Sequence, residues 1–294
     1  TAEGEEELGS PNYPQIIDKY EQRLRTADGV IFPMSGQAPD GQTSIVLGVK
    51  GIIYWELEAR GGSWGGPTVA EIHGSYKAIT DSPVLRLTKA ISSLVSADGN
   101  TILVPGYYDD VRPPTEEEQT LIAGYLANSN ESQIKEIMGV ERWIDDMSGV
   151  DVLHELIYTP SMNVDGIWGG YTEEGVKTIL PHKATAKMDS RLPMGINSDE
   201  AAARIRKHLD DQGFEDIEMR MLSSYPAAQT SVDTALVQAT ISVYKKYGPA
   251  PVVNPRIAGS APFYQFTERL QLPMIPVGLG FGQGAHAPNE TFLV

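Results

Sequence analysis

The most constraining feature of the sequence is a stretch in which apolar and polar side chains alternate, IIYWELEAR at residues 52–60. The side chains at the odd-numbered positions from 53 to 59 are apolar and share one face of a strand, whereas Tyr54, Glu56 and Glu58 share the other face. This period of two predicts a strand with one buried and one exposed face, which is typical of an antiparallel sheet. The chain is therefore expected to contain a sheet that is covered on one side.

The patterns that follow this strand predict a particular order of elements. Two helices are expected to start at the N-cap signals Ser82 and Ser198. Further strands are expected at 162–168, 183–191 and 216–222. Residues 52–222 therefore run strand, helix, strand, strand, helix, strand, with helical material inserted within 99–158. This order suggests a ferredoxin-like sandwich, an antiparallel sheet with helices on one face.

The domain organisation is indicated by two changes of character, near Gly51 and in the proline-rich stretch around Pro255. We expect 1–50 and 255–294 to form parts of one α/β domain. The segment 51–254 would then be an inserted α+β domain, because its sheet pattern differs from that of the flanking strands.

Composition excludes several classes of partner. The formal net charge of −16 leaves no basic excess to neutralise nucleic-acid phosphates or to bind an anionic membrane surface. No apolar run approaches membrane-spanning length and no signal peptide is visible, so a cytoplasmic protein is expected. The absence of cysteine excludes thiolate sites, and any metal must be held by His, Asp and Glu.

Candidate metal ligands lie near both ends of the chain. Glu7 closes a run of three glutamates, and His286 follows a glycine-rich loop in GAHAPNE. A carboxylate and an imidazole suit zinc or manganese, and the two residues would converge if the terminal segments form one domain. The plain alternatives are a solvated chain end for the glutamates and a packing or surface role for a lone histidine.

Several motifs in order resemble one enzyme family, the co-catalytic zinc peptidases that include carnosine dipeptidases, aminoacylase, glutamate carboxypeptidase and succinyl-diaminopimelate desuccinylase. The carnosinase-like branch is the most similar. The motifs are EGEEELGS, LGVKGIIYWELEARG, EIHGSYK, LVPGYYDDVRPPTEEE, KTILPHKATAKMDSRLP, AGSAP and GAHAPNE. The resemblance implies an α/β catalytic domain with an inserted ferredoxin-like lid that mediates dimerisation.

The resemblance also implies the roles of the catalytic and metal-binding residues. Glu6 matches the general base, and Glu7 and His286 match metal ligands. His73 matches a lid histidine that stabilises the oxyanion, typically in the active site of the partner subunit.

Four more residues match substrate-binding positions of the family: Thr178, Arg191, Gly259 and Ser260. The planar fork of Arg191 suits the free carboxylate of a dipeptide or an N-acyl amino acid. The structural alternative for Arg191 is a surface strand arginine paired with Asp189 or another acid. The alternative for Thr178 and Ser260 is a hydroxyl used in a turn.

The implied activity is that of a metal-dependent hydrolase that cleaves the amide bond of dipeptides or of C-terminal amino acids. Zinc is the expected metal, as a pair of ions in each subunit of the family, with manganese or cobalt as alternatives. The expected partners are a small peptide or N-acyl amino acid as substrate and a second copy of the chain, bound through the lid. Two alternatives stay open: a deacylase of N-acyl amino acids, and a catalytically incomplete homologue that only dimerises.

Two departures from the family pattern lead to further expectations. The upstream His-x-Asp metal motif of the family has no counterpart, so the chain resembles a fragment of a longer enzyme. We therefore expect the 294 residues alone to hold at most one loosely bound ion and not to hydrolyse dipeptides. Pro33, Met34 and Ser35 stand where many relatives place a metal-binding aspartate, so one metal is expected to be ligated differently or lost.

Overall fold

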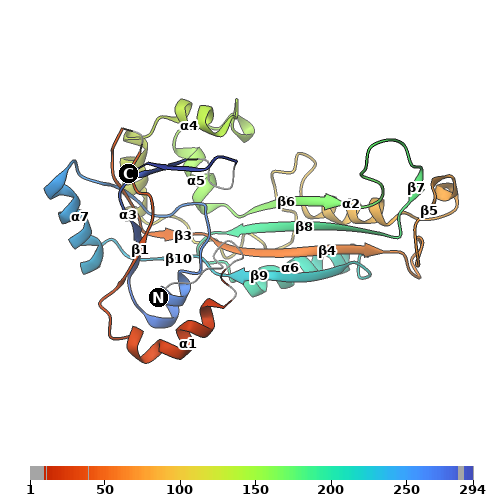
Figure 1. Cartoon of the computed structure of the whole chain (residues 1–294), viewed down its shortest axis with the longest axis horizontal. Coiled ribbons are helices and arrows are strands. Elements are labelled where there is room, and N and C mark those ends of the chain that lie inside the picture. Colours follow the sequence, from red (N-terminus) through yellow and green to blue (C-terminus); the bar gives the residue numbers. More distant parts are fainter. Residues whose placement is uncertain (1–9, 11, 39, 284–287, 294) are drawn as a thin grey trace. The chain divides into compact units, whose positions relative to one another are not determined.

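The computed structural model describes residues 10, 12–38, 40–283 and 288–293, and Figure 1 shows the whole chain. The chain divides into two compact units. Unit 1 contains the described parts of Thr1–Gly51, Arg112–Thr159 and Ala227–Val294, and unit 2 contains Ile52–Val111 and Pro160–Pro226. Each unit is therefore assembled from segments that are distant in the sequence.

Unit 2 is a four-stranded sheet with two helices. Its strands lie in the order β6 (Ser161–Trp168), β8 (Lys183–Leu192), β4 (Gly51–Arg60) and β9 (Glu218–Tyr225). The helices are α2 (Pro83–Leu94) and α6 (Ser198–Asp211). Apart from inserted elements, the chain order is β4, α2, β6, β8, α6, β9, which confirms the ferredoxin-like order predicted from the sequence.

The alternation in β4 explains why the helices cover one face of this sheet. Apolar side chains from two strands and both helices form one buried core: Ile53, Trp55, Leu57, Ala186, Met188, Leu87, Leu94, Ile205 and Leu209. Each large side chain buried in this way contributes about 1.5–3 kcal/mol. Tyr54, Glu56 and Glu58 lie on the opposite face and are only half-buried. That open face carries the polar residues of the candidate site.

The helix starts follow the capping signals with one difference. Ser82 caps α2 as predicted, since its Oγ accepts a hydrogen bond from a backbone amide of the first turn at 3.4 Å. Helix α6 is capped by Asn197, whose Oδ1 accepts from the backbone amides of Asp199 and Glu200 at 2.9 and 3.1 Å. The prediction that Ser198 caps this helix is therefore wrong by one residue, because the asparagine oxygen satisfies two amides at once.

Unit 1 combines short strand pairs with helices. Its parallel pairs are β1 (Val30–Pro33) with β12 (Met274–Val277) and β2 (Ser44–Val46) with β11 (Val252–Asn254). Its antiparallel pairs are β3 (Gly48–Val49) with β10 (Ala228–Gln229) and β13 (Phe281–Gln283) with β14 (Thr291–Leu293). Its helices are α1 (Tyr13–Leu24), α3 (Glu116–Ala127), α4 (Glu131–Met138), α5 (Val150–Tyr158), α7 (Ala235–Tyr247) and the short η3 (Ile144–Asp146) and η4 (Gln265–Leu270). Among the described residues, no helix has the length and apolar content needed to cross a membrane.

The borders of the units differ from those expected from the sequence. The segments 112–159 and 227–254, which we expected in the inserted domain, belong to unit 1. The reason is packing: Val237 of α7 shares a buried cluster with Ile45 of β2 and Ile275 of β12, and α3 packs against β11. The ferredoxin-like unit is therefore smaller than the expected inserted domain.

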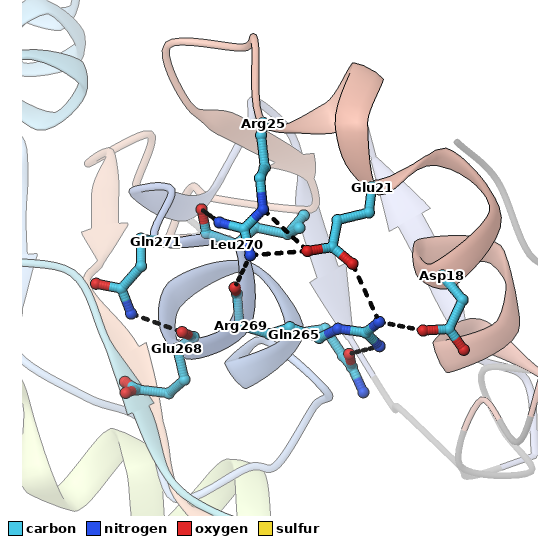
Figure 2. A network of polar contacts seen from close by, with 8 residues as sticks. All are labelled: Asp18, Glu21, Arg25, Gln265, Glu268, Arg269, Leu270 and Gln271. Carbon is cyan, nitrogen blue, oxygen red and sulfur yellow. Dashed lines mark hydrogen bonds and ion pairs between the residues drawn. The ribbon is translucent and has the colours of Figure 1, made fainter.

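Two arginines tie helix α1 to η4 (Figure 2). Arg25 donates from Nε and Nη2 to Glu21 Oε1 at 2.9 and 2.8 Å, and its guanidinium also donates to the backbone carbonyls of Arg269 and Leu270. Arg269 in turn pairs with Asp18 of α1. These groups are partly exposed, so each ion pair contributes at most about 1 kcal/mol. The buried apolar side of α1, which packs against η4, supplies the rest of the attachment.

A buried ion pair joins separate segments of unit 1. Arg256 is fully buried, and its Nη1 donates to Glu118 Oε1 at 2.9 Å and also to the side-chain oxygen of Gln229. Arg112 Nη2 donates to the same Glu118 oxygen at 2.7 Å. The Arg256 guanidinium lies over the ring of Tyr158, 4.7 Å from its centroid. One carboxylate thus neutralises a buried arginine and binds a second one.

Glu118 has a second role in helix α3. It forms a capping box with Thr115: the Thr115 hydroxyl accepts from the Glu118 amide at 3.2 Å, and the Thr115 amide donates to Glu118 Oε2 at 2.9 Å. Burial raises the pKa of the Glu118 carboxyl, but the Thr115 amide and the Arg256 guanidinium outweigh it and hold the pKa below its usual range. Glu118 is therefore ionised at neutral pH.

We predict that Glu118→Ala lowers the free energy of unfolding by about 3 kcal/mol, because it leaves Arg256 as a buried charge without its carboxylate. Urea denaturation at neutral pH measures this change. The matched control is Glu116→Ala, which removes an exposed carboxylate from the same helix turn and should change stability by less than about 0.5 kcal/mol. Equal unfolding midpoints for the two variants would contradict the role of the pair.

Candidate functional site

The structure describes five of the eight residues that the sequence analysis singled out. Glu6, Glu7 and His286 lie outside the described residues, so their roles as base and metal ligands stay predictions. Within the described part of the chain, no three His, Asp or Glu side chains are placed to hold a metal ion together. The five described residues form two groups in unit 2 and one loop in unit 1.

His73 and Thr178 lie together at one end of unit 2. His73 ends β5 (Ile72–His73), which pairs with β7 (Ile179–Leu180), and it precedes the 3₁₀ turn η2 (Gly74–Ala78). This strand pairing brings Thr178 Oγ1 within 3.2 Å of His73 Nε2. The structure therefore joins two residues that were predicted separately.

The hydrogen bonds of His73 define the position of its ring proton. The backbone amide of Ser75 donates to Nδ1 at 3.2 Å, and Ser75 Oγ lies 2.8 Å from the same nitrogen. A backbone amide can only donate, so Nδ1 is the acceptor and the proton of the neutral ring resides on Nε2. His73 therefore presents an exposed Nε2–H, which donates to Thr178 in this structure.

A carboxylate supports the same end of unit 2 from the neighbouring residues. Glu71 Oε1 lies 3.7 Å from Lys177 Nζ, and Glu71 Oε2 lies 3.9 Å from His182 Nδ1. Its own backbone amide and the Lys177 ammonium hold the pKa of the Glu71 carboxyl below its usual range. These exposed pairs are weak individually. Together they connect the segments that carry His73 and Thr178.

Arg191 lies near the end of β8 on the open face of the sheet. Its Nε donates to Asp189 Oδ1 at 2.9 Å, and the Asp189 side chain is almost fully buried while that of Arg191 is 35% exposed. Among the described residues, neither Nη1 nor Nη2 of Arg191 has a partner. The structural alternative considered for Arg191, a pair with Asp189, is thus present, and the outer edge of the guanidinium stays available.

A second carboxylate, Asp165, approaches this pair from strand β6. Asn163 Nδ2 donates to Asp165 Oδ1 at 3.0 Å and to Asp189 Oδ2 at 3.4 Å. Burial and the nearby charge of Asp189 raise the pKa of Asp165 to about 6. Burial and the same two carboxylates raise the pKa of Tyr54, which lies on the same face. Arg191 is therefore part of a small acidic cluster.

The two groups in unit 2 lie at opposite ends of one strand. Figure 1 shows the labelled strands β7 and β8. Thr178 directly precedes β7, which comes just before the start of β8 at Lys183, and Arg191 is the next-to-last residue of β8. Eight residues of extended strand span about 26 Å. A rigid strand therefore separates the His73–Thr178 pair from Arg191.

The Gly259–Ser260 loop belongs to unit 1 and is held by backbone contacts. The Lys50 amide donates to the carbonyls of Ile257 and Gly259 at 3.3 and 3.0 Å. Ser260 Oγ donates to the carbonyl of Gly51 at 3.0 Å. The Ser260 hydroxyl therefore has a structural partner, but one that lies 209 positions away and not within its own turn. Its predicted role in substrate binding stays a prediction.

Comparison with known proteins gives the family. The peptidase dimerisation domain of the M20 peptidases matches residues 47–217, more than half of the chain. The chain belongs to the M20 metallopeptidase family. Within this M20 chain, the match spans the whole of β4 and most of unit 2. Together with the dipeptidase relatives described next, it confirms the carnosinase-like resemblance found in the motifs.

Relatives of this M20 chain match nearly its entire length. It is 26% identical to the human Beta-Ala-His dipeptidase, over 98% of this chain and 57% of the relative. It is 27% identical to the Cys-Gly metallodipeptidase of Candida albicans, over 98% of this chain and 59% of the relative. The crystal structure of an M20 family metallo-carboxypeptidase from Sulfolobus solfataricus superposes with a TM-score of 0.87 at 36% identity, over 98% of this chain and 64% of that chain. The M20 chain thus spans less than two thirds of the length of each.

Sequence reasoning missed part of the surroundings of Arg191. Asp189 could be found because a residue two positions before a strand arginine shares its face. Asp165 could not, because it is the extra residue of a β-bulge: Val164 pairs with Met188, and the next pairing begins at Gly166. The bulge changes the alternation of β6, and only the paired structure shows that Asp165 approaches Asp189.

We predict that Asp165→Asn makes unit 2 increasingly more stable than the wild type as the pH rises from about 4 to about 6. The carboxyl of Asp165 has a pKa of about 6 in the folded chain and about 3.9 when unfolded. Across this window the unfolded chain loses the proton that the folded chain retains, so the wild type loses stability as the pH rises. Thermal melting at a series of pH values measures the difference.

The matched control for this prediction is Asp98→Asn. A hydrogen bond from Ser96 and one from the Asn100 amide hold the pKa of Asp98 below its usual range, so its contribution to stability is present above about pH 4 and lost below it. The Asp98 variant should therefore become less stable relative to the wild type as the pH rises. If the stability difference from the wild type changed with pH in the same direction for both variants, the raised pKa of Asp165 would be wrong.

Proposed function

We propose that the protein carrying this sequence is a metal-dependent dipeptidase or exopeptidase that hydrolyses the amide bond of a small peptide. Support comes from its place in the M20 family and from relatives named as dipeptidases. In the structure, the observation that carries the proposal is the hydrogen bond between His73 and Thr178, 105 positions apart. The contact unites two residues that the resemblance assigns to the same reaction.

The proposed metal site uses Glu7 and His286 as ligands. A carboxylate and an imidazole, in a chain without cysteine, suit zinc, with manganese or cobalt as alternatives. Relatives named metallodipeptidase support a divalent metal. When bound, such an ion supplies Lewis acidity. A chain without disulfides is also compatible with the cytoplasm, which we propose as its location.

The chain's own residues then have distinct roles in the proposed reaction. Glu6 takes the proton of the attacking water as general base. His73 donates its Nε2–H to the oxygen of the attacked amide, where negative charge develops, in place of its present contact with Thr178. Arg191 binds the free carboxylate of the peptide through its outer edge.

The spacing in unit 2 supports a homodimer in which His73 acts on a substrate held by the partner. A dipeptide spans about 7 Å, whereas about 26 Å of strand β8 separates the His73–Thr178 pair from Arg191. One copy of unit 2 therefore cannot apply both groups to one substrate. The dimerisation domain of the family supports a second copy as the source. Unit 2 is accordingly the proposed lid.

We predict that, in the whole protein that carries this sequence, Glu6→Gln keeps the bound metal but lowers turnover by on the order of 10²–10⁴, because a general base is lost and no ligand is removed. Glu7→Gln should lose metal as well as turnover. Metal analysis by plasma mass spectrometry, paired with an assay of Cys-Gly and β-alanyl-histidine cleavage, measures both. Metal loss in the Glu6 variant and retention in the Glu7 variant would reverse the two roles.

The same assay separates the alternative activity. An N-acetyl amino acid is offered beside the two dipeptides under identical metal loading. Faster hydrolysis of the acyl amino acid would favour a deacylase and overturn the dipeptidase proposal. No hydrolysis of any of the three by metal-loaded protein would leave only the dimerising role.

We predict that two inactive variants, His73→Ala and Glu6→Gln, recover activity when their subunits are exchanged. If His73 acts in the partner's site, each mixed dimer has one site with both residues intact, and an equal mixture reaches about a quarter of the wild-type rate. If His73 acts in its own chain, every site in the mixture lacks one group. Mixed dimers that form by sedimentation but show no recovered turnover would exclude action across the dimer.

A further inference from the structure

Asp189, Asp165 and Arg191 form a cluster that the proposed reaction does not yet explain. Asp189 binds the inner edge of the guanidinium through Nε at 2.9 Å, while its other oxygen lies 3.4 Å from Asn163 Nδ2. Asp189 is almost fully buried, so this attachment is held away from solvent. This hydrogen bond restrains one edge of the guanidinium, and its Nη1 and Nη2 have no partner among the described residues.

We propose that Asp189 is a positioning residue for Arg191 and that Asp165 sets the net charge that a substrate carboxylate meets there. This inference rests on the proposed function of Arg191 as the carboxylate receptor. Asp189 presents the Nη1–Nη2 edge as a fixed fork, which is the geometry for bidentate binding of a carboxylate. A free arginine would have to lose rotamer entropy first.

The charge of the cluster depends on one proton. With both aspartates ionised, the two carboxylates and the guanidinium sum to one negative charge, which repels a substrate carboxylate. When Asp165 takes up a proton from solvent, the sum is zero and the guanidinium attracts the ligand more strongly. Protonated Asp165 can also donate to Asp189, as two neighbouring carboxyls that share one proton do.

Other charged and titratable groups on this face do not remove the effect. Those of the adjacent strands are Lys183, Lys187, Asp189 and Arg191 on β8 and Tyr54, Glu56, Glu58 and Arg60 on β4. Glu56 pairs with Arg220 of β9 at 2.7 Å, and Glu58 pairs with Arg60 and lies 3.9 Å from Lys183 Nζ. Helices α2 and α6 cover the other face. Since Tyr54 has a raised pKa and Glu56 has its own cation, Asp165 is the group whose charge changes near pH 6.

The test uses the metal-loaded protein with Cys-Gly as substrate and Cys-Gly amide as a competitive inhibitor, between pH 5 and 7. The amide has the same amine and thiol as Cys-Gly but lacks the free carboxylate. The ratio of the KM of Cys-Gly to the inhibition constant of the amide therefore reports how much the carboxylate contributes to binding. This ratio should rise by about threefold to tenfold as the pH increases, with its midpoint near 6. A ratio independent of pH in the wild type would overturn the proposal.

Variants of the cluster give the second arm of the test. Asp165→Asn should keep the low ratio at every pH, whereas Glu218→Gln, which removes a charge from the opposite edge strand β9, should keep the wild-type pH profile. Asp189→Ala should raise the KM of Cys-Gly about tenfold with a smaller effect on kcat. Asp189→Asn retains an oxygen acceptor and should recover part of that loss. Loss of the pH profile in the Glu218 variant would show a general charge effect and overturn the proposal.

A readout without turnover separates this inference from the proposed function. The Nε resonance of Arg191 in an NMR spectrum, assigned with Arg191→Lys, should titrate with a midpoint near 6 and should not titrate in Asp165→Asn. Absence of hydrolysis together with this titration would refute the activity and retain the charge coupling within the cluster. Hydrolysis without the titration would support the activity and overturn the inference.

Discussion

The ion pair between Arg256 and Glu118 is the interaction on which unit 1 depends. A fully buried arginine is costly unless its charge is matched, and here a carboxylate, an amide oxygen and an aromatic face surround it. These groups come from α3, β10 and the end of α5, so the charge of the arginine is matched fully only when all three segments have assembled. That requirement adds to the apolar packing of α7 and α3 in holding 112–159 and 227–254 with the other segments of unit 1.

Lys50, another buried cation of unit 1, supports the glycine-serine loop. Arg256 lies three residues before Gly259, and between them the carbonyl of Ile257 accepts from the Lys50 amide. Lys50 is itself buried, and its Nζ donates to the carbonyl of Leu156 at the end of α5. Lys50 therefore contacts the loop through its backbone amide and α5 through its side chain. A loop fixed by buried charges before any ligand arrives loses little entropy on binding.

The parts of the structure that could be predicted from sequence are those with local signals. The alternation of β4 and the cap at Ser82 depend on neighbours in the chain, and both gave the right element. Arg256 stands in a proline-rich stretch typical of a surface connection, yet it is buried against Glu118, 138 positions away, and against Gln229 and Tyr158. Asp165 was missed for a related reason, since a bulge is a property of the paired strands. Within the candidate site, His73 and Thr178 could each be named from motifs, but their contact depends on the pairing of β5 with β7.

The end of unit 2 that carries His73 differs in character from the open face that carries Arg191. Near His73 several large apolar side chains are almost fully exposed: Val69 at 88%, Ile79 at 82% and Val176 at 94%. The open face, in contrast, has cross-strand ion pairs such as that of Arg220 with Glu56. Charged pairs are compatible with water, whereas exposed apolar side chains mark a surface that another molecule covers where they form a continuous patch. The homodimer proposed above would place a second chain at that end of the sheet, where it could both receive the chemistry proposed for His73 and cover its apolar neighbours.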